Sequence, residues 1–200
     1  SDREAIAIEI DQMKEEVLSL ANAQDSNGSF LFSGYKTNTI PFQKDLAGKI
    51  NYKGDRGIAQ GGGSPSNTAS MDFVNIASAG DAAVFGDLSS ANSSSTAMSS
   101  FTRGVFNGGA NPGNSDKQEY LTIATLGNAA DFGNLTDAVN LPAGCSNETR
   151  GLVAGGRDPG MSNIISYNTI ASTGNAIDFG DSLDTIVAAT SISNGHGGLG

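Results

Sequence analysis

Six aspartates between residues 81 and 184 are the residues that come closest to a metal-binding set. They are Asp81, Asp87, Asp131, Asp178, Asp181 and Asp184. Carboxylate oxygens at loop tips can bind Ca²⁺, but these residues do not have the spacing of an EF-hand loop. We therefore interpret them as solvated turn residues, and we predict neither a bound metal nor a cofactor.

Two copies of an Asp-Phe-Gly tripeptide, at 131–133 and 178–180, match the metal-binding tripeptide of protein kinases. No catalytic-loop motif and no glycine-rich phosphate loop accompanies them. The two copies are also 47 residues apart, in register with many other residues. We interpret both as structural.

Catalytic chemistry is further limited by two residues that occur once each. Cys145 is the only cysteine and His196 the only histidine, so one chain has no internal disulfide, histidine-based metal cluster or catalytic dyad. A pair of carboxylates acting on glycosides needs a defined separation and one raised pKa, and neither is visible in the sequence. The sequence therefore predicts a protein that is not an enzyme.

The composition restricts the partners. The 200 residues include 21 acidic and 11 basic side chains, a net charge of -10, which disfavours nucleic-acid binding because phosphate contacts need clustered Lys and Arg. No run of apolar residues is long enough for a membrane span, and nothing near Ser1 is typical of a signal peptide. With 38% apolar residues, 27 glycines and no tryptophan, a conventional dense core is not expected.

The first residues predict a short amphipathic helix. Ser1 and Glu4 have the spacing of a capping box, and Asn27-Gly28 provides a stop signal. One apolar stripe follows the helix at spacings of three and four: Ile6, Ile10, Met13, Val17 and Leu20. Because so short a helix is not stable alone, the stripe packs either on its own domain or on a partner subunit. Both alternatives stay open, and we predict these five residues as the partner interface.

Residues 1–56 resemble the flagellin superfamily, in particular its hook-associated protein 3 branch. The resemblance rests on the runs 2–7, 18–22 and 25–35, and continues through Pro41-Phe42 and 52–55. It implies a non-enzymatic, extracellular filament subunit that associates with itself or with neighbouring subunits. In that family the region is the end of a long coiled-coil helix that turns into an outer domain.

From Arg56 onward the sequence repeats three times with a period of 47 residues. The residues predicted to shape each repeat are Arg56, Arg103 and Arg150; Phe73, Tyr120 and Tyr167; and Phe85, Phe132 and Phe179. Glycines recur in the same register, including the pairs at 61–62, 108–109 and 155–156. We interpret Gly61-Gly62-Gly63 as a repeat turn, with a domain junction as the alternative. The recurring arginine is predicted to act inside each unit rather than on a ligand.

The fold class predicted is α+β, mainly β: a short N-terminal helix followed by three propeller-blade-like β-repeats. The charge density supports a boundary near residue 56, because 16 charged side chains lie in 1–56 and another 16 in the much longer 57–200. We place the domains at 1–56 and 57–200, with repeats at about 57–103, 104–150 and 151–200.

The repeats resemble kelch-like β-repeats of phage and environmental microbial structural proteins, most closely at 149–151 and 167–181. The resemblance implies a propeller-type blade in a virion or at a cell surface. Three units are fewer than a propeller normally contains. This leaves three alternatives. Copies from several chains complete a ring, the array stays open, or the chain is a piece of something longer.

Three functions stay open at the sequence level. The leading hypothesis is a structural subunit of an extracellular filament or virion, with a flagellar lead-in and a β-repeat display module. The first alternative is a phage tail or fibre module that binds a host glycan or surface protein, which aromatics exposed on loops would favour. The second is a fusion or composite chain without a single function.

Overall fold

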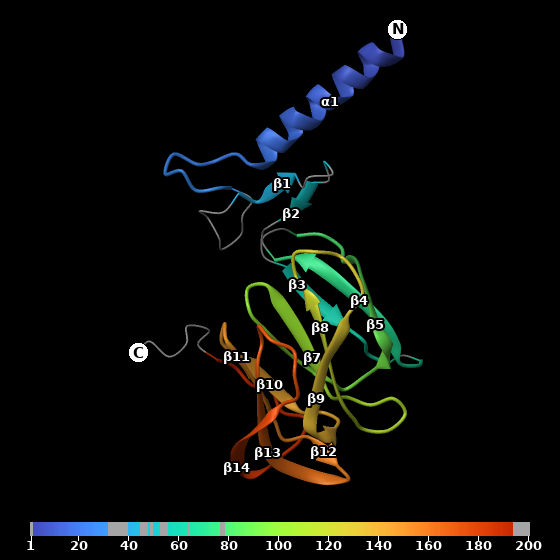
Figure 1. The fold of residues 1–200 in the computed structure, drawn as a ribbon, viewed down its shortest axis with the longest axis vertical. Coiled ribbons are helices and arrows are strands. Elements are labelled where there is room, and N and C mark those ends of the chain that lie inside the picture. The colour runs from blue at the N-terminus through green and yellow to red at the C-terminus, as the bar shows by residue number, and fades with distance from the viewer. Residues whose placement is uncertain are drawn as a thin grey trace. The chain divides into compact units, whose positions relative to one another are not determined.

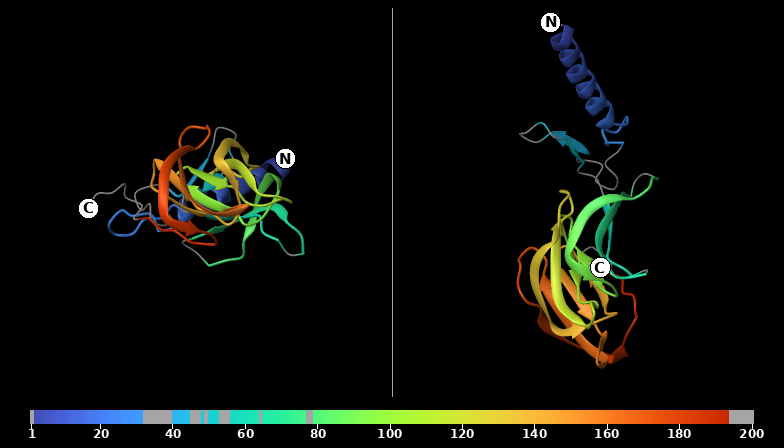
Figure 2. Two further views of the ribbon diagram at one scale, coloured as in Figure 1. Left: turned by 90° about the horizontal axis from the view of Figure 1, so that it is seen from below. Right: turned by 90° about the vertical axis from the view of Figure 1, so that its right-hand side faces the viewer.

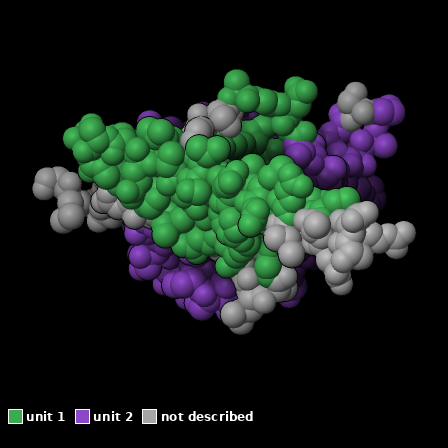
Figure 3. Space-filling view, turned by 90° about the horizontal axis from the view of Figure 1, so that it is seen from above, with its two compact units in different colours: residues 1–57, 73–82 green, residues 58–72, 83–200 purple. Residues whose placement is uncertain are grey.

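The computed structural model describes residues 2–31, 40–44, 48, 50–52, 56–63, 65–76 and 79–193. They form two compact units, residues 1–57 with 73–82 and residues 58–72 with 83–200 (Figure 3). The described part of the chain is mostly β with one helix (Figure 1). Ser1 of the predicted capping box and the single histidine, His196, lie outside the described residues, as do 32–35 and 53–55 of the flagellin-like runs.

In the first unit, helix α1 covers Asp2–Ala21 and is followed by the hairpin of β1 (Phe42–Lys44) and β2 (Ile50–Tyr52). The helix ends six residues before Asn27, so the stop predicted at Asn27-Gly28 is wrong. The Asp25 carboxylate accepts hydrogen bonds from the backbone N–H groups of Asn27 (2.8 Å) and Ser29 (2.9 Å). This side chain closes a separate tight turn, because aspartate competes with helix by bonding nearby backbone donors.

The remaining strands form three antiparallel sheets in chain order. The first sheet contains β3 (Arg56–Gln60), β4 (Thr68–Asn75) and β5 (Ala83–Asn92). The second contains β6 (Thr96–Ser99), β7 (Arg103–Asn107), β8 (Ser115–Thr122) and β9 (Ala130–Val139). The third contains β10 (Ala143–Ser146), β11 (Arg150–Ala154), β12 (Arg157–Asp158), β13 (Gly160–Thr169) and β14 (Ile177–Ile186).

Each complete sheet takes its first strand from the end of the preceding repeat. Strand β6 pairs with β7 and β10 pairs with β11, in both cases across a short turn. The second and third sheets lie face to face, with β6 against β10 and β9 against β14 (Figures 1 and 2). Every sheet has open edges, and the strand orders describe no closed barrel or propeller among the described residues. The propeller part of the predicted fold class stays a prediction.

The sequence period is also a period of backbone conformation. Three non-glycine residues with positive φ, Ser94, Leu141 and Ala188, are 47 residues apart and have φ of 58°, 54° and 53°. The glycine pairs at 61–62, 108–109 and 155–156 likewise share left-handed conformations, with φ of 61–65° at the first glycine and 101–106° at the second. Gly61-Gly62 is therefore a repeat turn, as predicted.

The core lies between the second and third sheets. It is formed by one cluster of buried side chains: Met98, Val105, Phe132, Leu135, Val139, Val153 and Ile170. Because each sheet is thin, this cluster needs residues from two consecutive sheets, as in other repeat proteins. No helix in the described part of the chain is both long and apolar enough to cross a membrane.

Candidate assembly interface

A loop of the second sheet docks on β5 of the first sheet, and a loop of the third sheet docks on β9 of the second. The backbone N–H of Gly127 donates to the carbonyl of Phe85 (3.0 Å), and that of Ala129 donates to the carbonyl of Asp87 (2.9 Å). The same contacts recur 47 residues later, from Gly174 to Phe132 (2.7 Å) and from Ala176 to Asn134 (2.8 Å). We call these two sets of contacts the first and second junctions.

An asparagine side chain completes each junction. The Asn128 Oδ1 atom accepts the backbone N–H of Asp87 (3.0 Å), and Asn175 Oδ1 accepts that of Asn134 (3.1 Å). Three successive residues of the loop thus satisfy the exposed backbone of the strand. The loop thus pairs mainly with main-chain groups of the strand, as a peptide does when it binds to the edge of a β-sheet.

Close backbone approach at the junctions requires glycine on the strand. A Cβ placed on Gly86 would lie 2.2 Å from the carbonyl oxygen of Gly127, and one placed on Gly133 would lie 2.4 Å from that of Gly174. Neither distance is possible for a real side chain. The glycine of the Asp-Phe-Gly tripeptide at 131–133 therefore makes room for the next sheet, which agrees with the structural interpretation of this motif.

The recurring arginines lie over the recurring aromatic rings. The guanidinium carbon is 5.0 Å from the ring centroid for Arg56 and Phe73, 4.3 Å for Arg103 and Tyr120, and 4.6 Å for Arg150 and Tyr167. Tyr120 and Tyr167 also make edge contacts with Phe132 and Phe179, with centroids 6.0 and 5.9 Å apart. The structure thus brings the arginine and the first aromatic of every repeat together, and in the last two repeats the phenylalanine joins them.

Arg103 also connects two sheets. Its Nη1 atom donates to the carbonyl of Ile170 at 2.9 Å, and Ile170 belongs to the buried cluster that contains Phe132. Phe85 and Phe132 are 3% and 2% exposed, whereas Phe179 is 51% exposed. The three phenylalanines occupy one register position, so their exposure depends on whether another sheet of the array is stacked upon them.

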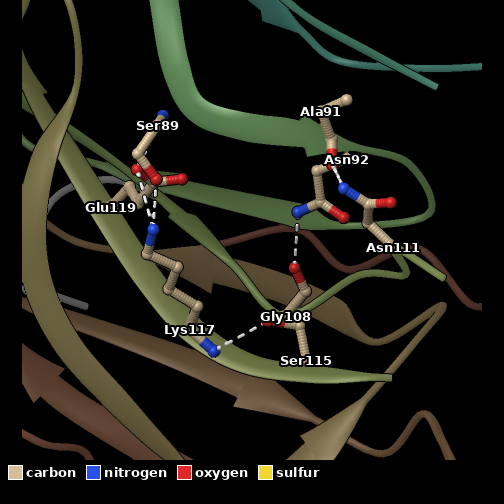
Figure 4. Close-up of polar contacts among 8 residues, drawn as sticks. All are labelled: Ser89, Ala91, Asn92, Gly108, Asn111, Ser115, Lys117 and Glu119. Atoms are coloured by element: carbon tan, nitrogen blue, oxygen red, sulfur yellow. Dashed lines mark hydrogen bonds and ion pairs between the residues drawn. The ribbon is translucent and has the colours of Figure 1, made fainter. Parts of the chain in front are cut away.

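Polar side chains line the contact between the first and second sheets (Figure 4). Glu119 is buried, and its carboxylate accepts the backbone N–H of Ser89 (3.0 Å) while Lys117 Nζ lies 3.5 Å away. Asn92 and Asn111 donate to the carbonyls of Gly108 (2.8 Å) and Ala91 (2.5 Å). The cavity beside them has a volume of about 40 Å³, enough for a few water molecules but not for a substrate.

The six aspartates interpreted above as turn residues form no metal site in the structure. No group of three or more His, Cys, Asp or Glu side chains within the described ranges is arranged to hold a metal ion. Of the six, Asp87 contributes its backbone to the first junction, and Asp178 accepts the N–H of Gly180 at 3.1 Å. Cys145 is half-buried in β10.

The predicted partner stripe on α1 is open to solvent. Ile6, Ile10, Met13, Val17 and Leu20 are between 44% and 71% exposed. The end of the helix is attached to the hairpin through Asn22, whose side chain accepts the backbone N–H of Phe42 (2.9 Å) and donates to its carbonyl (2.8 Å). Lys44 of β1 contacts Glu15 of α1. The stripe remains a predicted interface.

Two functional features were not predicted from the sequence. The junction asparagines Asn128 and Asn175 are 47 residues apart, so the sequence period marks them. Asp81 occupies the same position in the first repeat. The buried amide group of Gln118, Asn107 and Asn168 has no such signal. Gln118 Nε2 donates to Asn107 Oδ1 (2.6 Å) and Asn168 Oδ1 (2.8 Å). Met71 and Ile165 occupy the register of Gln118, so the repeat alone predicts an apolar residue there.

Comparison with known proteins shows partial similarity to flagellar proteins. The chain is 43% identical over 44 residues to flagellar hook-associated protein 3 of Escherichia coli, covering 22% of this chain and 14% of that protein. It is 32% identical over 59 residues to the protein of the same name from Salmonella typhimurium, covering 30% and 18%. No protein-family model matches the chain. The chain therefore contains a flagellin-like segment, and it spans less than a fifth of the length of these two relatives.

Proposed function

We propose that this chain is a non-enzymatic structural subunit of an extracellular, flagellar-type filament. The observation that carries the proposal is the segment similar to flagellar hook-associated protein 3. The apolar stripe of α1 is the surface through which the chain contacts a neighbouring subunit, and the β-sheets form a displayed outer module.

The aromatic residues support a structural role over glycan recognition. Phe85 and Phe132 are buried, and Phe132 belongs to the core shared by the second and third sheets. Carbohydrate recognition would use aromatics exposed around a groove. The cavity described above is too small for a sugar, and a larger one of about 520 Å³ beside α1 and the β1–β2 hairpin is lined by no aromatic side chain. Phe101, which lies on the turn before β7 and is 61% exposed, is the observation on the side of a recognition module.

The proposal is tested by measuring the solution mass of the full chain by light scattering. We expect wild type to be multimeric, and the Ile10→Ser/Val17→Ser double variant to associate at least about 100-fold more weakly, because two exposed apolar side chains are lost from the contact. The matched control is Glu9→Ser/Glu16→Ser, which changes exposed helix residues off the stripe. A wild-type monomer at high concentration, or a stripe variant that associates like wild type, would refute the proposal.

A further inference from the structure

We infer that Asn27 is a site of spontaneous covalent modification, where the Asn27-Gly28 pair closes to a succinimide that opens to isoaspartate, and that Asp25 sets the rate of this reaction. The inference is independent of the filament function. It starts from two Asn-Gly pairs in the described part of the chain, at 27–28 and 107–108, which have the same chemistry and opposite surroundings. A third pair, at 194–195, lies outside the described residues.

The reaction needs only the two residues and water. The Gly28 backbone nitrogen loses its proton to hydroxide and attacks the side-chain carbonyl carbon of Asn27, so that a C–N bond forms and ammonia leaves. Water then adds to one carbonyl of the succinimide and opens the ring to aspartate or to isoaspartate, in which the main chain runs through the former side chain. Glycine favours the attack because it has no Cβ and its backbone rotates freely.

The pair at 27–28 is open to this reaction. Asn27 and Gly28 are both exposed. Among the described residues, no hydrogen bond is made to the side-chain amide of Asn27. A Cβ on Gly28 would meet no described atom within 4 Å, so the backbone has room to turn toward that amide.

The pair at 107–108 has the opposite environment. Asn107 is fully buried, its Nδ2 donates to the carbonyl of Val105 (3.1 Å), and its Oδ1 accepts from Gln118 Nε2 (2.6 Å). The N–H of Gly108 donates to the carbonyl of Lys117 at 3.0 Å. Both reacting groups are therefore bonded elsewhere, and this pair can react only when the second sheet opens.

Asp25 controls how often the pair at 27–28 reaches the reactive geometry. Its carboxylate accepts the N–H groups of Asn27 (2.8 Å) and Ser29 (2.9 Å), and its backbone carbonyl accepts that of Gly28 (3.1 Å). One residue thus binds three consecutive N–H groups, including the attacking nitrogen. The turn must open before Gly28 attacks, and the carboxylate opposes the negative charge that forms on the nitrogen. Asp25 is therefore a positioning residue that slows the modification.

Isoaspartate would change the turn that follows α1. It adds one methylene group to the main chain at residue 27 and places a second carboxylate near that of Asp25, so the N–H groups of Gly28 and Ser29 shift and two like charges repel. Leu31 closes the same turn by donating to the carbonyl of Ala23 (2.9 Å). We expect faster amide hydrogen exchange at residues 28–31 in the modified chain, and unchanged exchange there would refute this effect on the turn.

Incubation of the full chain at mildly alkaline pH, followed by proteolysis and mass spectrometry, tests the site. We expect isoaspartate at residue 27, with conversion at residue 107 slower by more than about 100-fold, because a buried segment opens rarely. In urea the two pairs should convert at similar rates, since both are then Asn-Gly in an unfolded chain. No conversion at residue 27, equal rates in the folded chain, or a difference that persists in urea would overturn the inference.

Variants test the role of Asp25. Asp25→Ala removes the carboxylate from the turn, so we expect about tenfold faster conversion at residue 27 and no change at residue 107. Glu16→Ala is the matched control, because it removes an exposed carboxylate from α1, and it should convert like wild type. A wild-type rate in the Asp25 variant, or the same acceleration in the Glu16 variant, would refute control by Asp25.

Asn27→Gln tests the chemistry itself. Glutamine keeps a side-chain amide at this position, but its attack by Gly28 would have to close a larger and less favourable ring. We expect no conversion at residue 27 in this variant. Conversion as fast as in wild type would exclude the succinimide route and overturn the inference.

Discussion

At the scale of single residues, the amides of Gln118, Asn107 and Asn168 form a polar cluster inside the core. All three side chains are at most 5% exposed, and Gln118 bridges the other two. Asn168 also donates to the carbonyl of Gly174, whose N–H takes part in the second junction. Gln118 Oε1 is buried and has no hydrogen-bond partner among the described residues, so the group is only partly satisfied. The loss of a further member of a buried polar group is costly.

We expect Gln118→Met to destabilise the chain by about 2–4 kcal/mol, because it leaves two buried amide oxygens without their donor. Methionine fits the fold at this register, since Met71 is fully buried there in the first sheet. The matched control is Met71→Leu, which exchanges apolar groups of similar volume and should cost less than about 1.5 kcal/mol. Urea unfolding followed by circular dichroism measures both. Equal effects of the two variants would show that the amide group contributes no more than packing.

At the scale of elements, α1 depends on its attachment to the hairpin. A helix of 20 residues with an exposed apolar stripe is marginal alone. Asn22 fixes its last turn to β1 by pairing with both backbone groups of Phe42. Attachment through this side chain explains why the helix ends near Ala21 rather than at the glycine seven residues later.

We expect Asn22→Ala to lower the stability of the first unit by about 1–3 kcal/mol, because it leaves the backbone N–H and carbonyl of Phe42 without the Asn22 side chain. Amide hydrogen exchange should show faster exchange in the last turn of α1 and in β1, with β6–β14 unchanged. Asn27→Ala is the control, since the turn there is closed by Asp25 through the backbone of residue 27. Unchanged exchange at Phe42 in the Asn22 variant would contradict this role.

At the scale of the whole molecule, stability depends on stacking between consecutive sheets. The buried cluster takes residues from β6, β7 and β9 of the second sheet and from β11 of the third, together with Ile170. In such arrays the stability is approximately a sum over units and over the interfaces between neighbours. A residue at a covered junction should therefore matter far more than its equivalent on the exposed face of β14.

We expect Phe132→Ala to cost about 3–5 kcal/mol, because it leaves a cavity in the core between two sheets. Phe179→Ala changes the same register position and should cost only about 1 kcal/mol in the monomer, because half of that ring is already in water. Thermal unfolding at concentrations where the chain is monomeric measures the difference. Equal losses at the two positions would contradict a stability governed by stacking.

The sequence by itself determined the period and much of the local structure. Arginine, aromatic and glycine residues at 47-residue spacing predicted units of similar conformation, and positive φ angles in the same register confirm this for the glycine turns. The apolar stripe and the first residues predicted the helix, which begins at Asp2. These features depend on near neighbours, so their signal is contained in short stretches of sequence.

Only the tertiary structure decided which contacts these elements make. The sequence does not show that β6 and β10 belong to the following sheet, that Asn128 and Asn175 close the junctions, or that Gln118 bridges two buried asparagines. Phe132 and Phe179 lie in identical tripeptides, yet one is buried and the other half-exposed. The physical reason is that burial and pairing depend on residues distant in the chain, so identical local sequences acquire different environments from the sheets stacked upon them.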